Sequence, residues 1–190
     1  GSYTPAVSWP YEGVERELFF QHRTEDAGLP LWQDLDIEID CMVRNPEQHV
    51  SAWVLAGASR IILHIESTES LADAIARCQA GRVEIALALK PSTDLDTLEP
   101  YIKHAVFVQC MGSDTIGRHG VVLDPLTYDK IREINRRWPD MLIGVDIGVN
   151  NSTIRELYDA GARRFASGSG VFGTGSAVQG VRALEALLPV

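Results

Sequence analysis

Residues 60–89 read RIILHIESTESLADAIARCQAGRVEIALAL, and this stretch decides the fold class. Its two ends, residues 60–65 and 83–89, are short apolar runs of the kind that form buried strands. Between them, residues 67–80 have the spacing of an amphipathic helix, which Gly81 ends. A strand, a helix and a second strand in this order predict two parallel strands covered by a helix.

The same alternation recurs from residue 36 to the end of the chain. Six strand-then-helix units of this kind predict an α/β fold with a parallel sheet. The pattern leaves two arrangements open, an open doubly wound sheet and a closed barrel. We expect strands at 36–43, 60–65, 83–89, 105–110, 141–146 and 164–167, and helices at 45–56, 67–80, 94–103, 124–138, 152–160 and 176–188.

The first 35 residues differ from the rest, because no strand-helix-strand unit can be fitted to them. We still expect a single domain over residues 1–190, since 190 residues with 45% hydrophobic content suit one core. That length is slightly short for a full barrel of eight strands and eight helices, which takes roughly 200 to 250 residues.

The net charge and the cysteines limit which binding partners and which cellular compartment are expected. A net charge of −9 argues against nucleic acid and against anionic membrane surfaces, which both attract basic proteins. The three cysteines have no metal-binding spacing and are expected to be buried thiols in a reducing compartment. No apolar run approaches 18 residues and no signal-peptide pattern is present. We therefore expect a cytoplasmic protein.

Two predicted strands carry an acid near their carboxyl ends, where barrel enzymes place their active sites. In the strand at 36–43, alternation puts Asp40 and Met42 on one face, which lines a barrel interior or forms a solvated acidic edge. The strand at 141–146 ends in Asp146, and burying that charge is costly unless it has a partner or a role. Gly148 follows closely and allows the backbone to approach a ligand.

Two further features are candidates for ligand contacts. Residues 167–172 (SGSGVF) directly follow the last predicted strand, and glycines and hydroxyls there expose backbone N–H groups that can hold an anion. In the strand at 60–65, His64 either lines the cavity or is a core histidine with satisfied hydrogen bonds.

Five short motifs follow one another along the chain: IDCMVRNPE (39–47), LHIE (63–66), ALALKPST (86–93), VDIGV (145–149) and SGS (167–169). Their order and spacing, over about residues 36–188, resemble those of the ribulose-phosphate 3-epimerase family. The resemblance implies a TIM-type (β/α)8 barrel of the ribulose-phosphate-binding kind, with about six βα units visible in this chain.

The resemblance also implies an isomerase that inverts one carbon of a pentulose phosphate. One aspartate removes the proton beside the ketone, a divalent metal (Mn, Fe, Mg or Zn) stabilises the enediolate, and a second aspartate returns the proton to the other face. By resemblance, Asp146 is one of the catalytic carboxylates and a metal ligand. We expect Asp40, at the position of a ligand histidine of the family, to be the other catalytic and metal-binding carboxylate and to face the same cavity as Asp146. A phosphorylated sugar as substrate and a homo-oligomer are also implied. The expected substrate contacts are Met42, His64, Gly112, Gly148, Gly168 and Ser169.

The chain departs from the family's pattern in three places. Asp40 stands where the family has a ligand histidine, which makes the site richer in oxygen and less suited to zinc. Residues 113–120 replace the family's usual lid sequence. The family's second strand, with a histidine and an aspartate, has no counterpart, so we expect the N-terminal βαβ portion to be missing. The sequence is then a piece of a longer protein or a naturally short product.

Two other functions stay open on the sequence. A hexulose-phosphate lyase or a decarboxylase on the same fold would use a lysine beside its aspartates, and Lys90 is the strand-end lysine available. A non-catalytic or degenerate phosphosugar-binding barrel would explain the lost histidine and the missing second-strand carboxylate.

Overall fold

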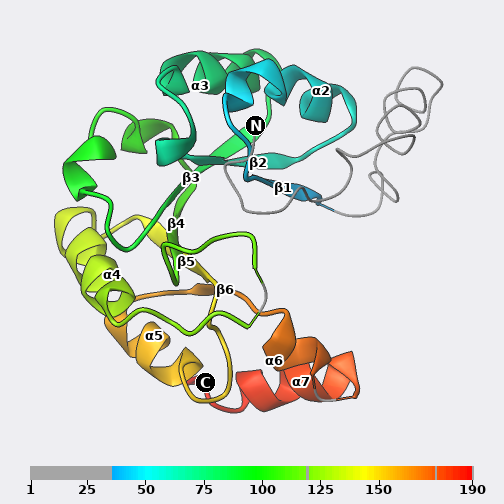
Figure 1. Cartoon of the computed structure of the whole chain (residues 1–190), viewed down its shortest axis with the longest axis vertical. Helices are drawn as coiled ribbons and strands as arrows, with labels where there is room; N and C mark the ends of the chain where they lie inside the picture. Colours follow the sequence, from blue (N-terminus) through cyan, green and yellow to red (C-terminus); the bar gives the residue numbers. More distant parts are fainter. Residues whose placement is uncertain (1–35, 119, 174, 190) are drawn as a thin grey trace. The chain divides into compact units, whose positions relative to one another are not determined.

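The computed structural model describes residues 36–118, 120–173 and 175–189 (Figure 1). Six strands follow one another in chain order within the sheet. They are β1 (Glu38–Cys41), β2 (Arg60–His64), β3 (Glu84–Leu89), β4 (Phe107–Met111), β5 (Leu142–Asp146) and β6 (Arg164–Ala166). Pairing is parallel between β1 and β2, between β4 and β5, and between β5 and β6. The predicted α/β fold with a parallel sheet is confirmed.

Helices separate most of the strands. The α-helices are α2 (Val50–Leu55), α3 (Leu71–Ala80), α4 (Leu126–Arg137), α5 (Ile154–Ala160), α6 (Ser169–Phe172) and α7 (Ala177–Glu185). Four short 3-10 helices are η1 (Pro46–Gln48), η2 (Ile65–Ser67), η3 (Leu95–Thr97) and η4 (Ile102–His104). The described part of the chain has no helix long and apolar enough to cross a bilayer.

The chain divides into two compact units, and β3 passes from the first to the second after Leu87. The first comprises residues 1–87 and 100–105, and the second comprises residues 88–99 and 106–190. Each contains one of the two aspartates that the sequence singled out.

In the first unit, α2 and α3 lie together on one side of β1 and β2 (Figure 1). The helix α3 buries Leu71, Ala74, Ile75 and Cys78, the spacing of a single apolar stripe. Its C-terminal Gly81 permits a close approach to α2, because a Cβ there would lie 2.4 Å from Val54 Cγ1.

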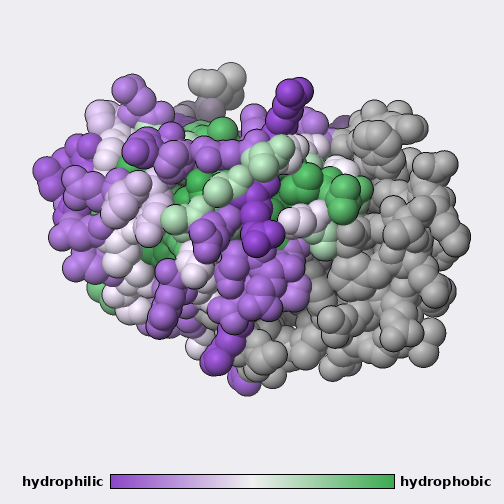
Figure 2. Space-filling model, turned by 90° about the horizontal axis from the view of Figure 1, so that it is seen from above, coloured by the Kyte–Doolittle hydropathy of each residue, from purple (hydrophilic) through white to green (hydrophobic). Residues whose placement is uncertain are grey.

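In the second unit, α4 and α5 pack against each other and α4 also contacts β4 and β5. Ile131 and Ile134 of α4 and Ile154 and Leu157 of α5 are fully buried. Apolar side chains fill the interiors of both units, while the described surface in Figure 2 is largely hydrophilic with apolar patches between. Burying apolar area of this kind is the main stabilising contribution to a small α/β domain.

Several predicted element boundaries were wrong. The helix expected at 94–103 is only the two short turns η3 and η4, and the helix expected at 45–56 is broken into η1 and α2. Asn45, directly before η1, has a left-handed φ of 53° and makes no side-chain capping bond. Before α4, Asp124 Oδ1 accepts from Leu126 N at 2.9 Å.

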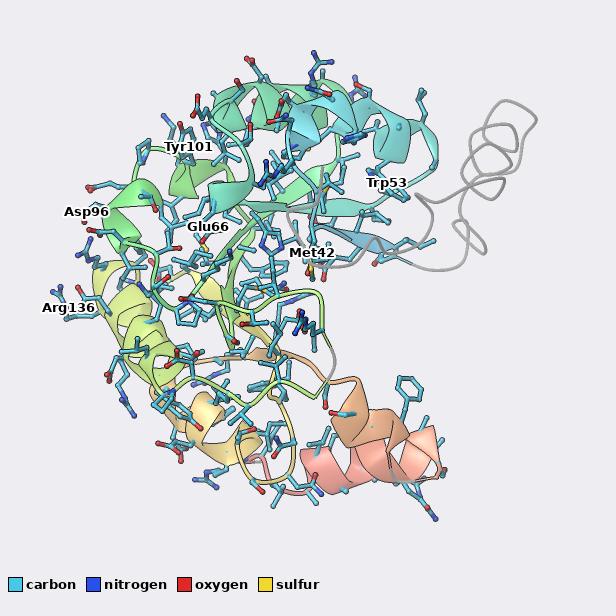
Figure 3. The ribbon with its side chains drawn as sticks, in the orientation of Figure 1. Met42, Trp53, Glu66, Asp96, Tyr101 and Arg136 are labelled. Atoms are coloured by element: carbon cyan, nitrogen blue, oxygen red, sulfur yellow. The ribbon has the colours of Figure 1, made fainter. Side chains whose placement is uncertain are left out.

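The first strand is shorter than predicted, and this changes the place of Met42. The strand β1 ends at Cys41, and Met42 N donates to Asp40 O at 3.0 Å while Val43 N donates to Cys41 O at 2.9 Å. The chain therefore turns at once after β1, and Met42 (labelled in Figure 3) lies in this turn and not within the strand. The strand alternation used to orient it does not apply there.

Candidate functional site

Asp40 lies one residue before the carboxyl end of β1, in the first unit. The parallel register pairs it with Ile62 of β2, so that His64 lies two residues further along the neighbouring strand. The side chains meet, with His64 Nε2 at 2.7 Å from Asp40 Oδ1. The Asp40 side chain is 25% exposed, whereas that of His64 is completely buried. The sequence singled out both residues but did not predict their pairing.

Asp146 is the last residue of β5, in the second unit, and is partly exposed. Its register partner in β4 is Met111. One carboxylate oxygen accepts from the next backbone amide, Ile147 N, at 2.8 Å, and its own carbonyl oxygen accepts from Gly112 N at 2.6 Å. Both the backbone and the side chain of Asp146 are therefore held at the point where β5 ends.

The turn after Asp146 is unusual, because Ile147 and Gly148 both have positive φ, 76° and 75°. Glycine adopts this left-handed conformation readily, but a β-branched residue does so only under constraint. The constraint is visible in Gly112, where a Cβ would lie 2.0 Å from Ile147 O, and in Leu123, which closely abuts Gly148. Gly112 is buried against this turn.

The loops after β5 and β6 contact each other, as a shared anion pocket requires. Ser167 Oγ donates to Val149 O at 2.7 Å, and Gly148 O accepts from Thr153 Oγ1 at 2.7 Å. Gly168 and Ser169 follow at the surface, and a Cβ at Gly168 would have no atom within 4 Å. The structure adds the short helix α6 at Ser169–Phe172, where the sequence predicted a loop.

The cysteines take no part in this chemistry. All three are free and buried. Burial raises the pKa of Cys41 to about 12 and that of Cys110 to about 12, and it raises the pKa of Cys78 to about 11. A thiol with such a pKa stays protonated at neutral pH and is a poor nucleophile and metal ligand. Buried, reduced thiols were the expectation from the sequence, and the structure confirms their burial.

A resident divalent metal would need several oxygen or nitrogen ligands converging on one point. Within the described residues, no group of three His, Cys, Asp or Glu side chains is placed to hold a metal ion. The donor set of this part of the chain does not meet the requirement. Binding of a divalent metal by this protein remains a prediction.

Each expected site residue can now be placed in one of the two units. Asp40, Met42 and His64 belong to the first unit; Gly112, Asp146, Gly148, Gly168 and Ser169 belong to the second. That Asp40 and Asp146 share one cavity stays a prediction, as do their catalytic roles. Lys90, directly after β3, is partly exposed.

Sequence reasoning missed Ile147 and Leu123, which fix the turn at Asp146. No motif identifies a left-handed isoleucine, because the sequence gives no sign of the neighbours that force it. The His64–Asp40 pair could have been found, since both residues lie near the carboxyl ends of adjacent parallel strands.

Comparisons with known proteins show which family the chain belongs to. Residues 19–172 match the model of the "Ribulose-phosphate 3 epimerase family". A ribulose-phosphate 3-epimerase of Schizosaccharomyces pombe is 30% identical over 70% of this chain and 59% of its own length. A ribulose-phosphate 3-epimerase of Oryza sativa, named as the cytoplasmic isoform, is 30% identical over 83% of this chain and 73% of its own length. The chain thus matches less than two thirds of the yeast protein.

Solved structures agree on the fold. KGPDC from Streptococcus mutans, in complex with D-R5P, superposes with a TM-score of 0.69 at 15% identity, over 92% of this chain and 79% of its own. A 3-hexulose-6-phosphate synthase superposes with a TM-score of 0.65 at 19% identity, over 93% of this chain and 82% of its own. At these identities the likeness shows the fold alone, and it confirms the TIM-type α/β class expected from the sequence.

Proposed function

This chain belongs to the ribulose-phosphate 3-epimerase family, and from that premise we propose that it epimerises a pentulose phosphate by proton transfer at the carbon beside the ketone. Members of this family are isomerases and generally use a divalent metal. The observation that carries the proposal is the held aspartate at the end of β5, Asp146. Its carboxylate is partly exposed while its backbone is fixed on both sides.

Asp146 is the group we assign to proton transfer. A base must lie within hydrogen-bonding reach of the proton that it removes and must not reorganise as it does so. The bond from Ile147 N to one carboxylate oxygen limits the rotation of this side chain. The carboxylate takes the proton from the carbon beside the ketone, and the electron pair of that C–H bond moves toward the carbonyl oxygen to give an enediolate.

Inversion requires a second acid on the other face of the planar enediolate, and we assign this role to Asp40. It lies near the carboxyl end of its strand, as Asp146 does, and its carboxylate reaches the surface beside a buried partner. Protonation of the same carbon from this side yields the opposite configuration, and the two carboxyl groups then exchange roles in the reverse reaction.

We assign the substrate phosphate to the loops after β5 and β6. Support comes from the contact between Ser167 and Val149, which brings Gly168 and Ser169 to the loop that carries Gly148. The open space at Gly168 leaves room for an anion to approach backbone N–H groups. The remaining expected contacts, Met42 and Gly112, are part of this proposal as residues near the two strand ends.

The proposal is tested by incubating the protein with D-ribulose 5-phosphate in deuterium oxide, with and without added Mn²⁺. We expect deuterium to appear at the carbon beside the ketone and xylulose 5-phosphate to accumulate. Exchange without epimerisation would mean that only one carboxylate acts. A melting temperature raised by the substrate, with neither exchange nor turnover, would favour the non-catalytic phosphosugar binder and exclude the epimerase.

We further propose a cytoplasmic location and a homo-oligomeric state. The buried, free thiols of the three cysteines support a reducing compartment, in which disulfides are rare. Light scattering of the purified protein measures the oligomeric state directly, and a monomer at micromolar concentration would contradict it.

A further inference from the structure

The pair formed by Asp40 and His64 has an uneven burial that assigns a different task to each residue. The His64 side chain is completely buried, and that of Asp40 is 25% exposed. A group that reacts with a ligand must reach the surface, whereas a group that only orients another can be enclosed. Within this pair the carboxylate is therefore the end that meets a ligand, and the imidazole is the support behind it.

The direction of this hydrogen bond follows the protonation state of Asp40. In the ionised form the carboxylate can only accept, and Nε2–H of His64 then donates to Asp40 Oδ1 at 2.7 Å. A short bond of this kind, to a charged acceptor and shielded on the imidazole side, is stronger than a neutral one in water. It restrains the rotamer of Asp40, whose side chain stays 25% exposed.

The backbone around His64 is itself fixed, which a support must be. Ser67 Oγ donates to His64 O at 2.6 Å, and Asn45 N donates to Ser67 O at 3.1 Å. These bonds tie the end of β2 to the turn that follows β1. They hold the backbone of His64, and the complete burial of the ring limits the movement of its side chain.

A second pair on the same two strands shows what an ordinary contact looks like here. Arg60 donates to Glu38 at 2.9 Å, and both side chains are partly exposed, 22% and 28%. Arg60 also donates to Glu84, so this ion pair belongs to a three-residue network in which every side chain keeps some contact with water. In the pair at the carboxyl ends of these strands, by contrast, one partner is removed entirely from water.

We propose that His64 is a positioning residue: its buried Nε2–H holds the Asp40 carboxylate in the orientation in which it meets the sugar phosphate. This inference rests on the proposed function, in which Asp40 is one of the two proton-transferring groups. It replaces the direct substrate contact expected for His64 from the sequence, because a fully enclosed ring acts on the substrate through Asp40.

The test compares three substitutions. His64→Leu removes the donor, and His64→Gln keeps an N–H donor at a similar reach. His104→Leu is the matched control, because His104 in the same unit also forms a side-chain hydrogen bond, to Gln79 at 3.1 Å, at an exposed place. We expect His64→Leu to lower kcat for deuterium uptake by about tenfold or more with KM within about twofold, since misorientation affects the reacting step.

The same series separates positioning from a purely structural role. His64→Gln should recover most of the lost kcat, and His104→Leu should match the parent protein. A His64→Leu variant that folds and keeps its kcat would overturn the inference, as would an equal loss of kcat in the leucine and glutamine variants. A change confined to the melting temperature would also overturn it.

A substrate-free measurement keeps this inference separate from the proposed function. In ¹⁵N-labelled protein, the His64 Nε2–H proton should give a protected, strongly downfield resonance that shifts upfield in Asp40→Ala and is unchanged in His104→Leu. If that resonance is present and no deuterium uptake occurs, the proposed function fails while the contact stands. If the resonance is absent or indifferent to Asp40→Ala, the inference fails whatever the activity.

Discussion

The two strand ends that carry aspartates hold them in different ways. At the end of β1 the Asp40 carboxylate is held through its side chain by the buried His64, 2.7 Å away. At the end of β5, Gly112 N holds the backbone carbonyl of Asp146, and the amide of the left-handed Ile147 holds one of its carboxylate oxygens. A carboxylate can thus be oriented by a partner or by the chain itself, and the two solutions fail under different substitutions.

The largest expected effect is on the activity of Asp146→Asn. Asparagine keeps the size and the acceptor for Ile147 N but cannot take up a proton, so deuterium uptake should fall by about 10² to 10⁴-fold. Stability should change by less than about 1 kcal/mol, because the backbone bonds that hold this residue persist. Urea unfolding and the exchange assay measure the two effects. Wild-type uptake in Asp146→Asn would remove this residue from the chemistry.

The next prediction tests whether the close contact of Gly112 with the turn after Asp146 holds this turn in place. In Gly112→Ala the new Cβ would lie 2.0 Å from Ile147 O, so the turn after Asp146 must shift. We expect a loss of about 2 to 3 kcal/mol in the free energy of unfolding, as for other overpacked sites.

The matched control for this substitution is Gly168→Ala, where the added Cβ meets nothing within 4 Å. Its stability should stay within about 0.5 kcal/mol of the parent, as at other open surface positions. Equal destabilisation of the two variants would show that the contact around Gly112 is not what fixes the turn.

Substitutions that remove the Asp40–His64 hydrogen bond should lower the free energy of unfolding by a smaller amount than Gly112→Ala. The matching substitution of Asp146 should not have this effect. Asp40→Ala removes the acceptor from a buried imidazole N–H, at a cost of about 1 to 2 kcal/mol. Asp40→Asn keeps an acceptor and should cost less than about 1 kcal/mol. Asp146→Ala in the same urea titration serves as the comparison. If Asp40→Ala and Asp40→Asn had the same free energy of unfolding, the hydrogen bond to His64 would not contribute to stability.

The smallest expected effect lies outside both strand ends, on the outer face of α4 (Arg136 is labelled in Figure 3). Hydrogen bonds from Arg136 and Arg137 lower the pKa of Glu133 to about 2 from an ordinary value of 4.5. Its ionised form therefore stabilises the folded state above pH 4.5, and this contribution is lost as the pH falls toward 2.

Because Glu133 is solvated, this contribution should be small and weakened by salt. We expect Glu133→Gln to melt slightly below the parent at pH 7, with the difference shrinking toward acid pH and at about 1 M NaCl. Glu185→Gln, at the exposed end of α7, is the control. A melting difference that grew on acidification would contradict a lowered pKa for Glu133.

The sequence predicted the features that depend on neighbouring residues in the chain, above all the positions of the strands. Apolar runs located five of the six strands to within a few residues, because a buried parallel strand must be apolar on both faces, and the alternating pattern of residues 36–43 located β1. The failures occurred where neighbours decided the outcome. The stretch at 94–103 has helix-forming residues, but the chain has only η3 and η4 there. The helix expected at 45–56 does not begin at Asn45, which has a left-handed φ of 53°.

For the candidate site, too, the sequence predicted some features and not others. Strand periodicity and the position of acids at strand ends were enough to single out Asp40 and Asp146, and the motif order was enough to indicate the family that the comparisons confirm. The loops after β5 and β6 contact each other, as expected where consecutive parallel strands end at the same edge of a sheet.

The sequence by itself determined the α/β class, the family and the two acidic strand ends, because these follow from periodicity and from motifs that are each only a few residues long. Only the tertiary structure decided how each aspartate is held. The His64 contact joins residues 24 apart in sequence, and the turn at Ile147 depends on Gly112 and Leu123 from another loop. Such contacts are set by packing between elements, which no local pattern of residues encodes.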